Sequence, residues 1–237
     1  MVAGTASGTA VEVVDLATTP LRELNQRLHD LAGAKDGPTR WRVLNPRGAH
    51  AVACGLDAEI DVEIDGHVGY YCAGMNQLAN VRVRGNASTG LAENMMSGTV
   101  VIEGSVSQSA GASAHGGLLV VHGDAAARCG ISMKGVEIVV RGSVGHLSGF
   151  MAQSGCLVVC GDAGEALGDS LYEARLYVRG DVASLGADCV EKELGAEHVA
   201  QLRGLLERAG FDDVDPSSFR RYGSARELYN FKIDNAY

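Results

Sequence analysis

One glycine recurs every 19 residues along most of the chain. The series comprises Gly66, Gly85, Gly104, Gly123, Gly142, Gly161 and Gly180. A fixed period is the signature of a repeat architecture, and this one is too short for a propeller blade or a helical-hairpin repeat. It has room for a short strand, a corner, a second stretch and another corner. The spacing therefore predicts one coil of a solenoid for each of these corner glycines.

The residues before each corner glycine predict a strand. Two positions before it stands only Ile or Val, and four positions before it only Val, Leu or Ile. Residues two apart share one face of a strand, so these columns predict a dry interior. Parallel crossovers favour the right hand, and hexapeptide β-helices do not match a period of 19. We therefore predict an all-β chain, a right-handed parallel β-helix of about seven turns with the corner glycines as its structural corners.

Composition excludes several other classes. The chain has 32 glycines but four prolines, with 46% hydrophobic and 21% charged residues, which argues against collagen and ordinary disorder. A net charge of −9 weighs against a nucleic-acid or anionic-membrane surface. The sequence contains no long uncharged apolar run and no signal-peptide pattern at its start, so we expect a cytoplasmic protein.

The flanks predict caps around the repeat. We divide the chain into an N-terminal helical extension (1–42), the β-helix (43–190) and a C-terminal helix with a docking tail (191–237). Pro20 favours a helix start with a leucine stripe that continues to Gly33. A second amphipathic helix is predicted over 196–209, with Gly210 as its stop. The tail is rich in aromatic residues: Phe211, Phe219, Tyr222, Tyr229, Phe231 and Tyr237.

The outward-facing columns of the strands differ in character. One position before the corner glycine, Asp65, Arg84 and Glu103 alternate in charge and predict ion pairs between coils. Three positions before it, charged residues give way to four valines: Val101, Val120, Val139 and Val158. An apolar outward stripe needs a cover. The chain's own termini and a partner are both open, and we favour a partner.

The six cysteines lack the CxxC spacing of zinc and iron–sulfur sites. We therefore interpret them as reduced thiols that pack as small apolar residues.

Two carboxylate pairs occupy equivalent positions in neighbouring coils. Asp162 and Asp181 follow their glycines directly, in a column of Asn, Ser and Asp that favours the capping of backbone N–H groups. Asp169 and Asp188 lie eight positions after their glycines, and their role is harder to explain by the capping of turns. Paired carboxylates on neighbouring coils are what a carbohydrate-cleaving β-helix uses, so a catalytic dyad stays open as an alternative.

Five of the six methionines lie about ten residues after a corner glycine, in segments such as Gly69–Gln77 and Ala92–Gly98. Methionine is a flexible gap-filler in cores and an adaptable residue at contact surfaces. Both interpretations remain open.

The turns of the form Gly-x-x-Gly-x-x-x-Gly, as in Gly142–Gly149 and Gly161–Gly168, resemble those of the GXGXG family. That family forms the C-terminal β-helix of the glutamate synthase large subunit and the β-helical subunit of formylmethanofuran dehydrogenase. The resemblance covers about residues 43–190 and is nearest to the stand-alone, glutamate-synthase-domain-3-like subunit. The matching segments are Gly69–Gln77, Ala92–Gly98, Cys129–Gly135, Met151–Gly155, Gly168–Ala174 and Ser184–Glu191.

The resemblance implies a three-chain enzyme of the N-methylglutamate synthase type, which acts on glutamate and methylamine. Its partners would be a glutamine-amidotransferase-like subunit and a glutamate-synthase-like subunit that holds FMN and, as a further expectation, an iron–sulfur cluster. Val2 follows Met1 here, where an amidotransferase needs cysteine, and no strand–helix alternation predicts an FMN-binding barrel. We therefore expect no catalytic, cofactor or metal residue on this chain, although whether it is itself an enzyme stays open.

Resemblance and residue type together predict a partner interface made of Tyr70, Tyr71, Met75, Asn76, Asn94, Met95, Met96, Met133, Lys134, Met151 and Gln153. Two alternative functions remain. One is the carbohydrate-active enzyme with Asp169 and Asp188, and the other is the β-helical subunit of a formylmethanofuran dehydrogenase-like complex.

Overall fold

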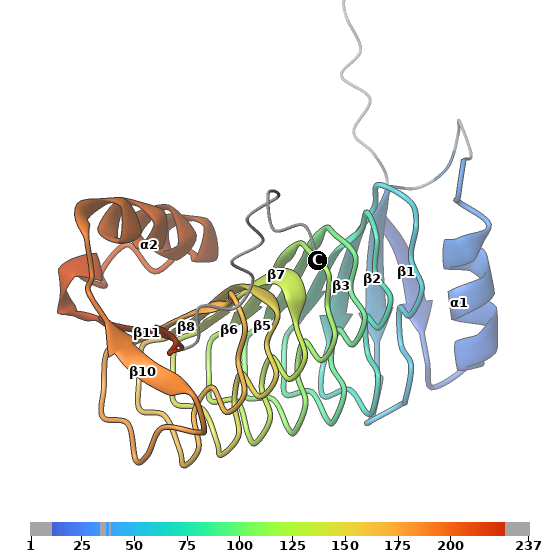
Figure 1. Ribbon diagram of the computed structural model, residues 1–237. Helices are drawn as coiled ribbons and strands as arrows, with labels where there is room; N and C mark the ends of the chain where they lie inside the picture. The colour runs from blue at the N-terminus through green and yellow to red at the C-terminus, as the bar shows by residue number, and fades with distance from the viewer. Residues whose placement is uncertain (1–10, 34–36, 38, 226–237) are drawn as a thin grey trace, which may run out of the picture.

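The structure, a computed structural model, describes residues 11–33, 37 and 39–225. Its strands form one 11-stranded sheet in the order β1-β2-β3-β4-β5-β6-β7-β8-β9-β11-β10 (Figure 1). The strands are β1 (Val11–Asp15), β2 (Arg40–Leu44), β3 (Asp61–Asp65), β4 (Asn80–Val83), β5 (Thr99–Ile102), β6 (Leu118–Val121), β7 (Lys134–Val140), β8 (Ser154–Val159), β9 (Arg175–Val178), β10 (Cys189–Lys192) and β11 (Arg220–Ser224).

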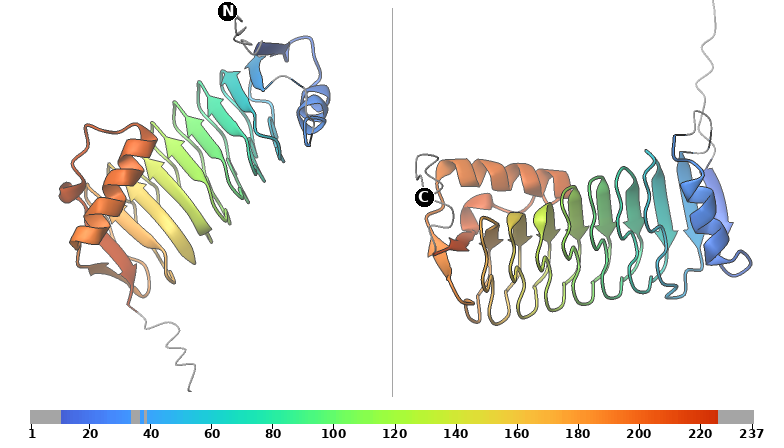
Figure 2. Two further views of the ribbon diagram at one scale, coloured as in Figure 1. Left: turned by 90° about the horizontal axis from the view of Figure 1, so that it is seen from above. Right: turned by 45° about the vertical axis from the view of Figure 1, so that its right-hand side comes forward.

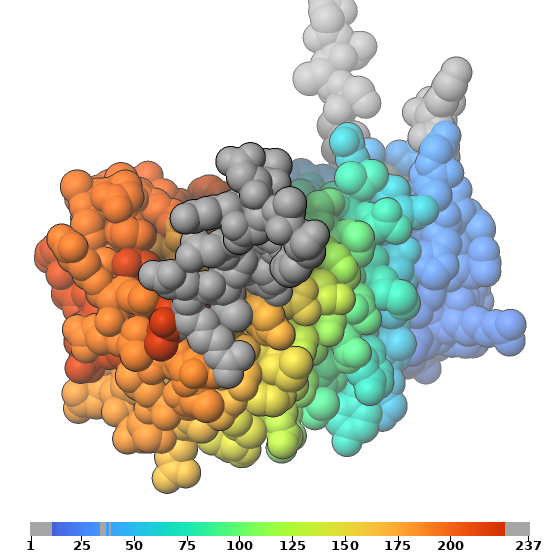
Figure 3. Space-filling view, in the orientation of Figure 1, coloured from blue at the N-terminus to red at the C-terminus, as the bar shows by residue number. Residues whose placement is uncertain are grey.

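The 19-residue period is the register of this sheet. From β3 to β9 each strand pairs in parallel with the next, and every paired residue of the coil strands is 19 positions further along, apart from an irregularity at the start of β7. A second parallel ladder of single bridges runs down the next side of each coil, from Val68 to Val182. The coils therefore stack one on another, as Figures 2 and 3 show. The predicted parallel β-solenoid is confirmed.

The interior of the coils is a dry aliphatic core. All residues two and four positions before the corner glycines are buried, with Val83, Ile102 and Leu119 fully inside. The single-bridge ladder adds a third wall of alternating Val and Ala. Because each residue sits on its own equivalent in the next coil, a column of one residue type fills the core without large gaps.

The corner glycines are required by close contact between coils. A Cβ atom on Gly142 would lie 2.1 Å from Asp124 Oδ1 and 2.8 Å from the carbonyl oxygen of Gly123. The glycines at 104, 123, 161 and 180 meet the preceding coil in the same way. Of the seven, Gly66 alone has a left-handed φ, at +130°. Close approach, rather than unusual φ, therefore explains most of this column.

Left-handed residues form a second regular pattern. In the coils that begin at Gly66 through Gly161, the residues five, seven and nine positions later all have φ between 51° and 73°. Most are not glycine, and the set includes Tyr71, Arg128 and Leu147. Left-handed backbone costs an L-residue about 1–2 kcal/mol. The backbone N–H groups of these left-handed residues point in turn to the preceding and to the following coil. Ala73 N–H donates to the Val52 carbonyl of the preceding coil, and Met75 N–H donates to the Glu93 carbonyl of the following coil. These hydrogen bonds between coils offset the strain.

The N-terminal end of the solenoid is closed by α1 (Leu21–His29) and β1. Leu24 and Leu28 of α1 are buried in the core, which confirms the predicted leucine stripe. Asn25 fixes the helix to the first coil, since it donates to the Ala51 carbonyl at 2.8 Å and accepts from Ala53 N–H at 3.0 Å. The helix ends at His29, before the expected Gly33. The strand β1 was not predicted.

The C-terminal end carries α2 (Ala196–Ala209) and a 3₁₀ turn, η1 (Pro216–Ser218), and α2 has the predicted bounds and the left-handed Gly210 cap. Figure 2 shows α2 across the strands of this end. It covers three of the four valines of the predicted stripe, because Val120, Val139 and Val158 are buried in one cluster with residues of α2 and of the segment after it: Leu202, Leu205, Leu206, Ala209, Phe211, Val214 and Phe219. Val101 packs against this cluster but is only partly buried. Our preference for a partner as the cover was wrong.

Ion pairs and hydrogen bonds fix this cover to the sheet. Arg141 makes a two-pronged contact with Asp213, at 2.8 and 2.5 Å, and Arg208 pairs with Glu137. Of the predicted aromatic tail, Phe211, Phe219 and Tyr222 are buried, and Tyr222 lies in β11. The remaining tail aromatics, Tyr229, Phe231 and Tyr237, lie outside the described residues.

Candidate interaction surfaces

The polar column that directly follows the corner glycines is a hydrogen-bond ladder. Each of its side chains accepts the backbone N–H of the residue 19 positions later, at 2.8–3.1 Å: His67, Asn86, Ser105, Asp124, Ser143 and Asp162. Asp162 thus binds the N–H of Asp181 at 2.8 Å. The predicted capping is present, although the N–H groups come from the next coil. This pair of carboxylates joins coils together.

Asp169 and Asp188 do not occupy equivalent positions. The last coil is one residue short, because Ala163 bridges Val182 across 19 residues whereas Leu167 bridges Leu185 across 18. Gly186 consequently lies over Asp169, and the Asp169 carboxylate accepts from Ser170 Oγ at 2.8 Å and Ala187 N–H at 3.3 Å. Asp188 is in the left-handed region at φ 61°. The expectation that these two residues occupy equivalent positions was wrong, whereas the catalytic dyad itself stays an untested alternative.

The cysteines are packing residues in the described chain. All six are free, five are buried, and Cys54 is half-buried. Burial raises the pKa of Cys72 and Cys129 to about 12, and that of Cys156, Cys160 and Cys189 to about 11. A thiol needs its thiolate form to act as a nucleophile. These five thiols therefore stay protonated and unreactive at neutral pH.

Three exposed methionines, Met75, Met96 and Met151, lie on one edge of the solenoid, nine to eleven residues after Gly66, Gly85 and Gly142. Because coils stack in register, these positions follow one another down the edge. Hydrogen bonds link them, as from Met96 N–H to the Asn76 carbonyl at 2.8 Å. We call this surface the methionine edge and define it by its exposed residues: Met75, Leu78, Asn94, Met96, Lys134, Met151 and Gln153.

Two exposed tyrosines adjoin the methionine edge. Tyr71 approaches Gly90 of the next coil so closely that a Cβ there would lie 2.6 Å from its ring. Tyr70 stacks on His50, with ring centroids 4.5 Å apart. About half of the surface of both tyrosines remains exposed. The edge thus combines flexible thioethers with rigid aromatic rings, the residue types favoured at protein interfaces.

Three residues of the predicted interface are core residues instead. Asn76, Met95 and Met133 are completely buried. Met95 and Met133 lie ten positions after their glycines, and the equivalent position in the coil between them is the buried Ala114. Burial confirms the core interpretation for these two methionines, whereas the contact interpretation of the exposed ones stays a prediction. Asn76 donates to the carbonyls of Ala79 and Ser97, and its Oδ1 atom has no partner.

A groove of about 620 Å³ lies on the outer face of β1 to β5. This is the half of the strand face that α2 leaves uncovered (Figure 2). Its apolar wall is formed by Val11, Val13 and Val101, and its floor carries charged residues. Sequence reasoning missed the groove because it missed β1. The alternation of Val11, Val13 and Asp15 with Glu12 and Val14 is the signal that could have found the strand.

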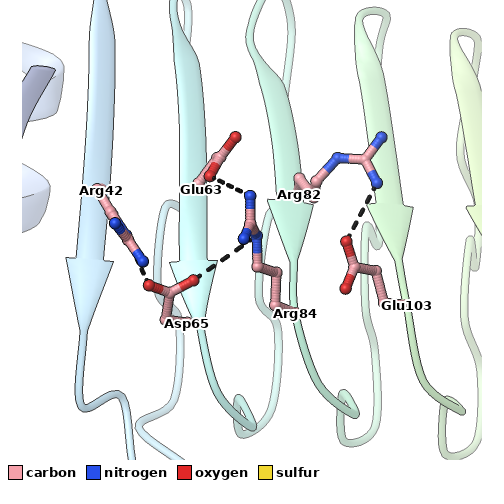
Figure 4. A network of polar contacts seen from close by, with 6 residues as sticks. All are labelled: Arg42, Glu63, Asp65, Arg82, Arg84 and Glu103. Carbon is pink, nitrogen blue, oxygen red and sulfur yellow. Dashed lines mark hydrogen bonds and ion pairs between the residues drawn. The ribbon is translucent and has the colours of Figure 1, made fainter.

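Ion pairs between coils line this open half (Figure 4). Arg42 contacts Asp65 at 2.6 Å, Arg84 contacts Glu63 at 2.8 Å and Asp65 at 3.7 Å, and Arg82 contacts Glu103 at 3.3 Å. The predicted pairing of Asp65 with Arg84 is confirmed, whereas Glu103 pairs with Arg82 of the neighbouring outward column. These pairs are exposed, and each contributes only about 0–1 kcal/mol. Their arrangement suits a solvated surface.

Comparison with known proteins gives one clear relation. Protein GlxC of Rhizobium meliloti (strain 1021) is 63% identical over 225 residues, which make up 94% of this chain and 98% of the relative. The chain belongs to the same family as Protein GlxC. No established family model matches the sequence, so membership of the GXGXG family stays a prediction.

The match to the GlxC family takes in the caps as well as the coils. Only 6% of the chain lies outside the alignment, and residues 1–42 and residues 191–237 are each a larger part of the chain than that. The alignment with Protein GlxC must therefore include part of each cap. Within the described ranges, neither helix combines the length and apolar character needed to cross a bilayer. The same residues contain no group of three or more His, Cys, Asp or Glu side chains placed to hold a metal ion.

Proposed function

We propose that this chain is the non-catalytic β-helix subunit of a glutamate-synthase-like complex. In the specific form of the proposal, the complex is an N-methylglutamate synthase that uses glutamate and methylamine. The subunit would join an amidotransferase-like chain to an FMN-containing synthase-like chain. The observation that carries the proposal is the methionine edge, an adaptable contact surface displayed on a rigid column of coils.

The chemistry of the described side chains supports a structural role. The carboxylates that follow the corner glycines accept backbone N–H groups, and five thiols have a pKa of about 11 or 12. Groups of these kinds, committed to hydrogen bonds or held neutral by burial, are poor acids, bases and nucleophiles at neutral pH.

The shape of the molecule suits a spacer. Parallel strands lie about 4.8 Å apart, so the six intervals from β3 to β9 separate the outer coils by roughly 29 Å. Every interval is fixed by backbone ladders on two sides. Two partners bound at different heights on this column would keep a constant separation, which transfer of a small amine between two active sites requires.

The assignment to a glutamate-synthase-like system rests on the resemblance of turns such as Gly142–Gly149 to the GXGXG family, and the family relation to Protein GlxC is compatible with it. The choice of methylamine as substrate rests on the resemblance alone. FMN, together with an iron–sulfur cluster, would be held by the synthase-like partner.

Co-expression with the two partner chains tests the proposal. We expect the three chains to co-elute and to form N-methylglutamate from glutamate and methylamine. Met75→Asp and Met96→Asp each place a charge on the methionine edge without touching the core, so both should weaken co-elution and activity together. Leu185→Asp is the matched control, since Leu185 is also exposed but lies on the last coil.

The isolated chain should show no flavin absorbance and no turnover. A stoichiometric flavin spectrum on the purified single chain would contradict the proposal. So would full complex formation by the Met75→Asp and Met96→Asp variants, because the methionine edge would then not be the contact surface.

A further inference from the structure

The two ends of the sheet are finished differently. At the C-terminal end β11 runs antiparallel to both β9 and β10, and the two added strands carry Arg220, Arg221 and Lys192. At the N-terminal end β1 is the outermost strand and pairs only with β2 among the described residues. Within the described ranges, no strand therefore pairs with the backbone N–H and C=O groups on the outer edge of β1.

Apart from its shortness and the outward Asp15, the strand β1 lacks the features that protect exposed edges. Natural edge strands carry outward charges, proline or a bulge that discourage pairing with another chain. Here Val11 and Val13 face outward and are 50% and 54% exposed. The charged residues of the strand already make contacts within the same chain, since Glu12 pairs with Arg27 and Asp15 Oδ1 accepts from Asn45 at 2.8 Å.

The contacts of the neighbouring helix are with the core, the first coil and one side chain of β1. Helix α1 buries Leu24 and Leu28 against the interior of the coils, Arg27 pairs with Glu12 of β1, and other polar residues bind the first coil. Asn25 binds Ala51 and Ala53, and His29 contacts the Cys54 carbonyl at 2.8 Å. The cap thus closes the core and leaves the outer edge of β1 without a paired strand in the described ranges, next to the groove on β1 to β5.

We propose that β1 pairs antiparallel with β1 of a second copy of this chain, about a two-fold axis at Val13. A two-fold interface must be self-complementary, because both subunits contribute the same surface. Two copies of one strand that pair antiparallel meet this condition. Centred on Val13, this pairing sets Val13 opposite itself and Val11 opposite Asp15 of the second copy. The four outward valines then form one apolar stripe across the joint.

Charge favours a second copy as the occupant. Arg40 lies beside Val11 in the register of β1 and β2, and its side chain is 61% exposed, with Asp61 3.9 Å away. In the proposed register Asp15 of the second copy lies one strand beyond Val11, within reach of the long Arg40 side chain. Two five-residue strands that pair bury less surface than a standard interface, which buries about 1,600 Å². We therefore expect a dissociation constant in the micromolar range.

Sedimentation equilibrium of the purified full-length chain tests the proposal without either partner, and so independently of the proposed function. Over about 5–200 μM the mass should rise from 24.7 kDa towards twice that value. Val13→Lys, which places a charge on the edge, should keep the chain monomeric with unchanged circular dichroism. Leu185→Lys, at an exposed apolar position on the far end, should dimerise like the original chain.

Cross-linking tests the register. Val13→Cys should form an intermolecular disulfide under mild oxidation, because the two Cβ atoms would be about 5 Å apart. Val11→Cys is almost equally exposed but would lie opposite Asp15, so it should not cross-link to itself. A chain that stays monomeric throughout, a dimer unaffected by Val13→Lys, or equal cross-linking at positions 11 and 13 would overturn the proposal.

Discussion

Single contacts between neighbouring coils explain the residue pattern of this chain. Asp124 Oδ1 accepts the N–H of Ser143 at 2.8 Å and lies where a Cβ on Gly142 would be. The polar side chain of one coil and the glycine of the next therefore depend on each other. A column of glycines beside a column of Asn, Ser and Asp is the sequence pattern that this contact produces.

Gly142→Ala tests this dependence. The added methyl group would displace the Asp124 carboxylate and press on the Gly123 carbonyl oxygen, so we expect the free energy of unfolding to fall by about 1–3 kcal/mol. Gly204→Ala is the control, because Gly204 lies in α2 with open space at its Cβ position. That change should raise stability by up to about 1 kcal/mol. Urea unfolding measures both, and equal effects would contradict the role of close contact.

Buried thiols give the stability of the chain a defined dependence on pH. Cys129 has a pKa of about 12 in the folded chain against an ordinary value of 9.0. Between these values the folded state keeps a proton that the unfolded state has lost, so stability is full below pH 9 and falls as pH rises towards 12. One such thiol contributes a slope of about 1.4 kcal/mol per pH unit.

Cys129→Ala should therefore flatten the decline of unfolding free energy between pH 9 and pH 11. Urea unfolding in the presence of a reductant at several pH values measures the slope. Cys54→Ala provides the comparison, since Cys54 is only half-buried, and its removal should change the slope less. A slope that Cys129→Ala leaves unchanged would show that this thiol ionises in the folded chain as readily as in the unfolded one.

The structural role of the corner glycines could be predicted from the sequence, whereas the positions of the left-handed residues could not. The corner glycines form a column of one residue type. The left-handed positions hold residues as different as Tyr71, Ala92, Arg128 and Leu147. Hydrogen bonds between coils impose that conformation on whatever residue is present, so no local preference reveals it.

At the scale of elements, α2 and the segment after it act as a cover for half of the strand face. Leu202 is completely buried in the cluster with Val139 and Val158, and Tyr177 donates to Gln201 of α2 at 3.0 Å. Burial raises the pKa of Tyr177 to about 12. The cover is thus an integral part of the core on that side.

Leu202→Ala should lower the free energy of unfolding by about 2–5 kcal/mol, the usual cost of truncating a buried leucine. Arg203→Ala, next to it on the exposed side of the helix, should change stability by no more than about 0.5 kcal/mol. Urea unfolding of both variants distinguishes a packed cover from a loosely attached helix. Similar small effects of the two changes would contradict the packing described here.

The sequence predicted the bounds of α2 but not its place. The leucines of α2 indicate an apolar helix face, and the valine stripe indicates an apolar sheet surface. The sequence does not say that these two surfaces cover each other, because another segment or a partner could cover either one. Only the structure shows that Arg141 forms an ion pair with Asp213, next to the contact between α2 and the valine stripe. The missed strand β1 lies outside the 19-residue period, where no repeat supports a short alternating segment.

At the scale of the whole molecule, the chain is a column with distinct sides. One strand face is half covered by α2 and half lined with ion pairs, and one edge exposes methionines. The stacked coils follow from the repeat alone. The division into covered and open surfaces required the structure, because the register of the caps against the coils depends on contacts between distant segments.

We propose that this chain holds two catalytic partners together. Light scattering tests this role through the mass of the complex that the amidotransferase-like and FMN-containing chains form with and without this chain. We expect a single three-component species when it is present and separate partners when it is omitted, with N-methylglutamate formed only in the first case. A stable, active assembly of the two partners alone would contradict the account.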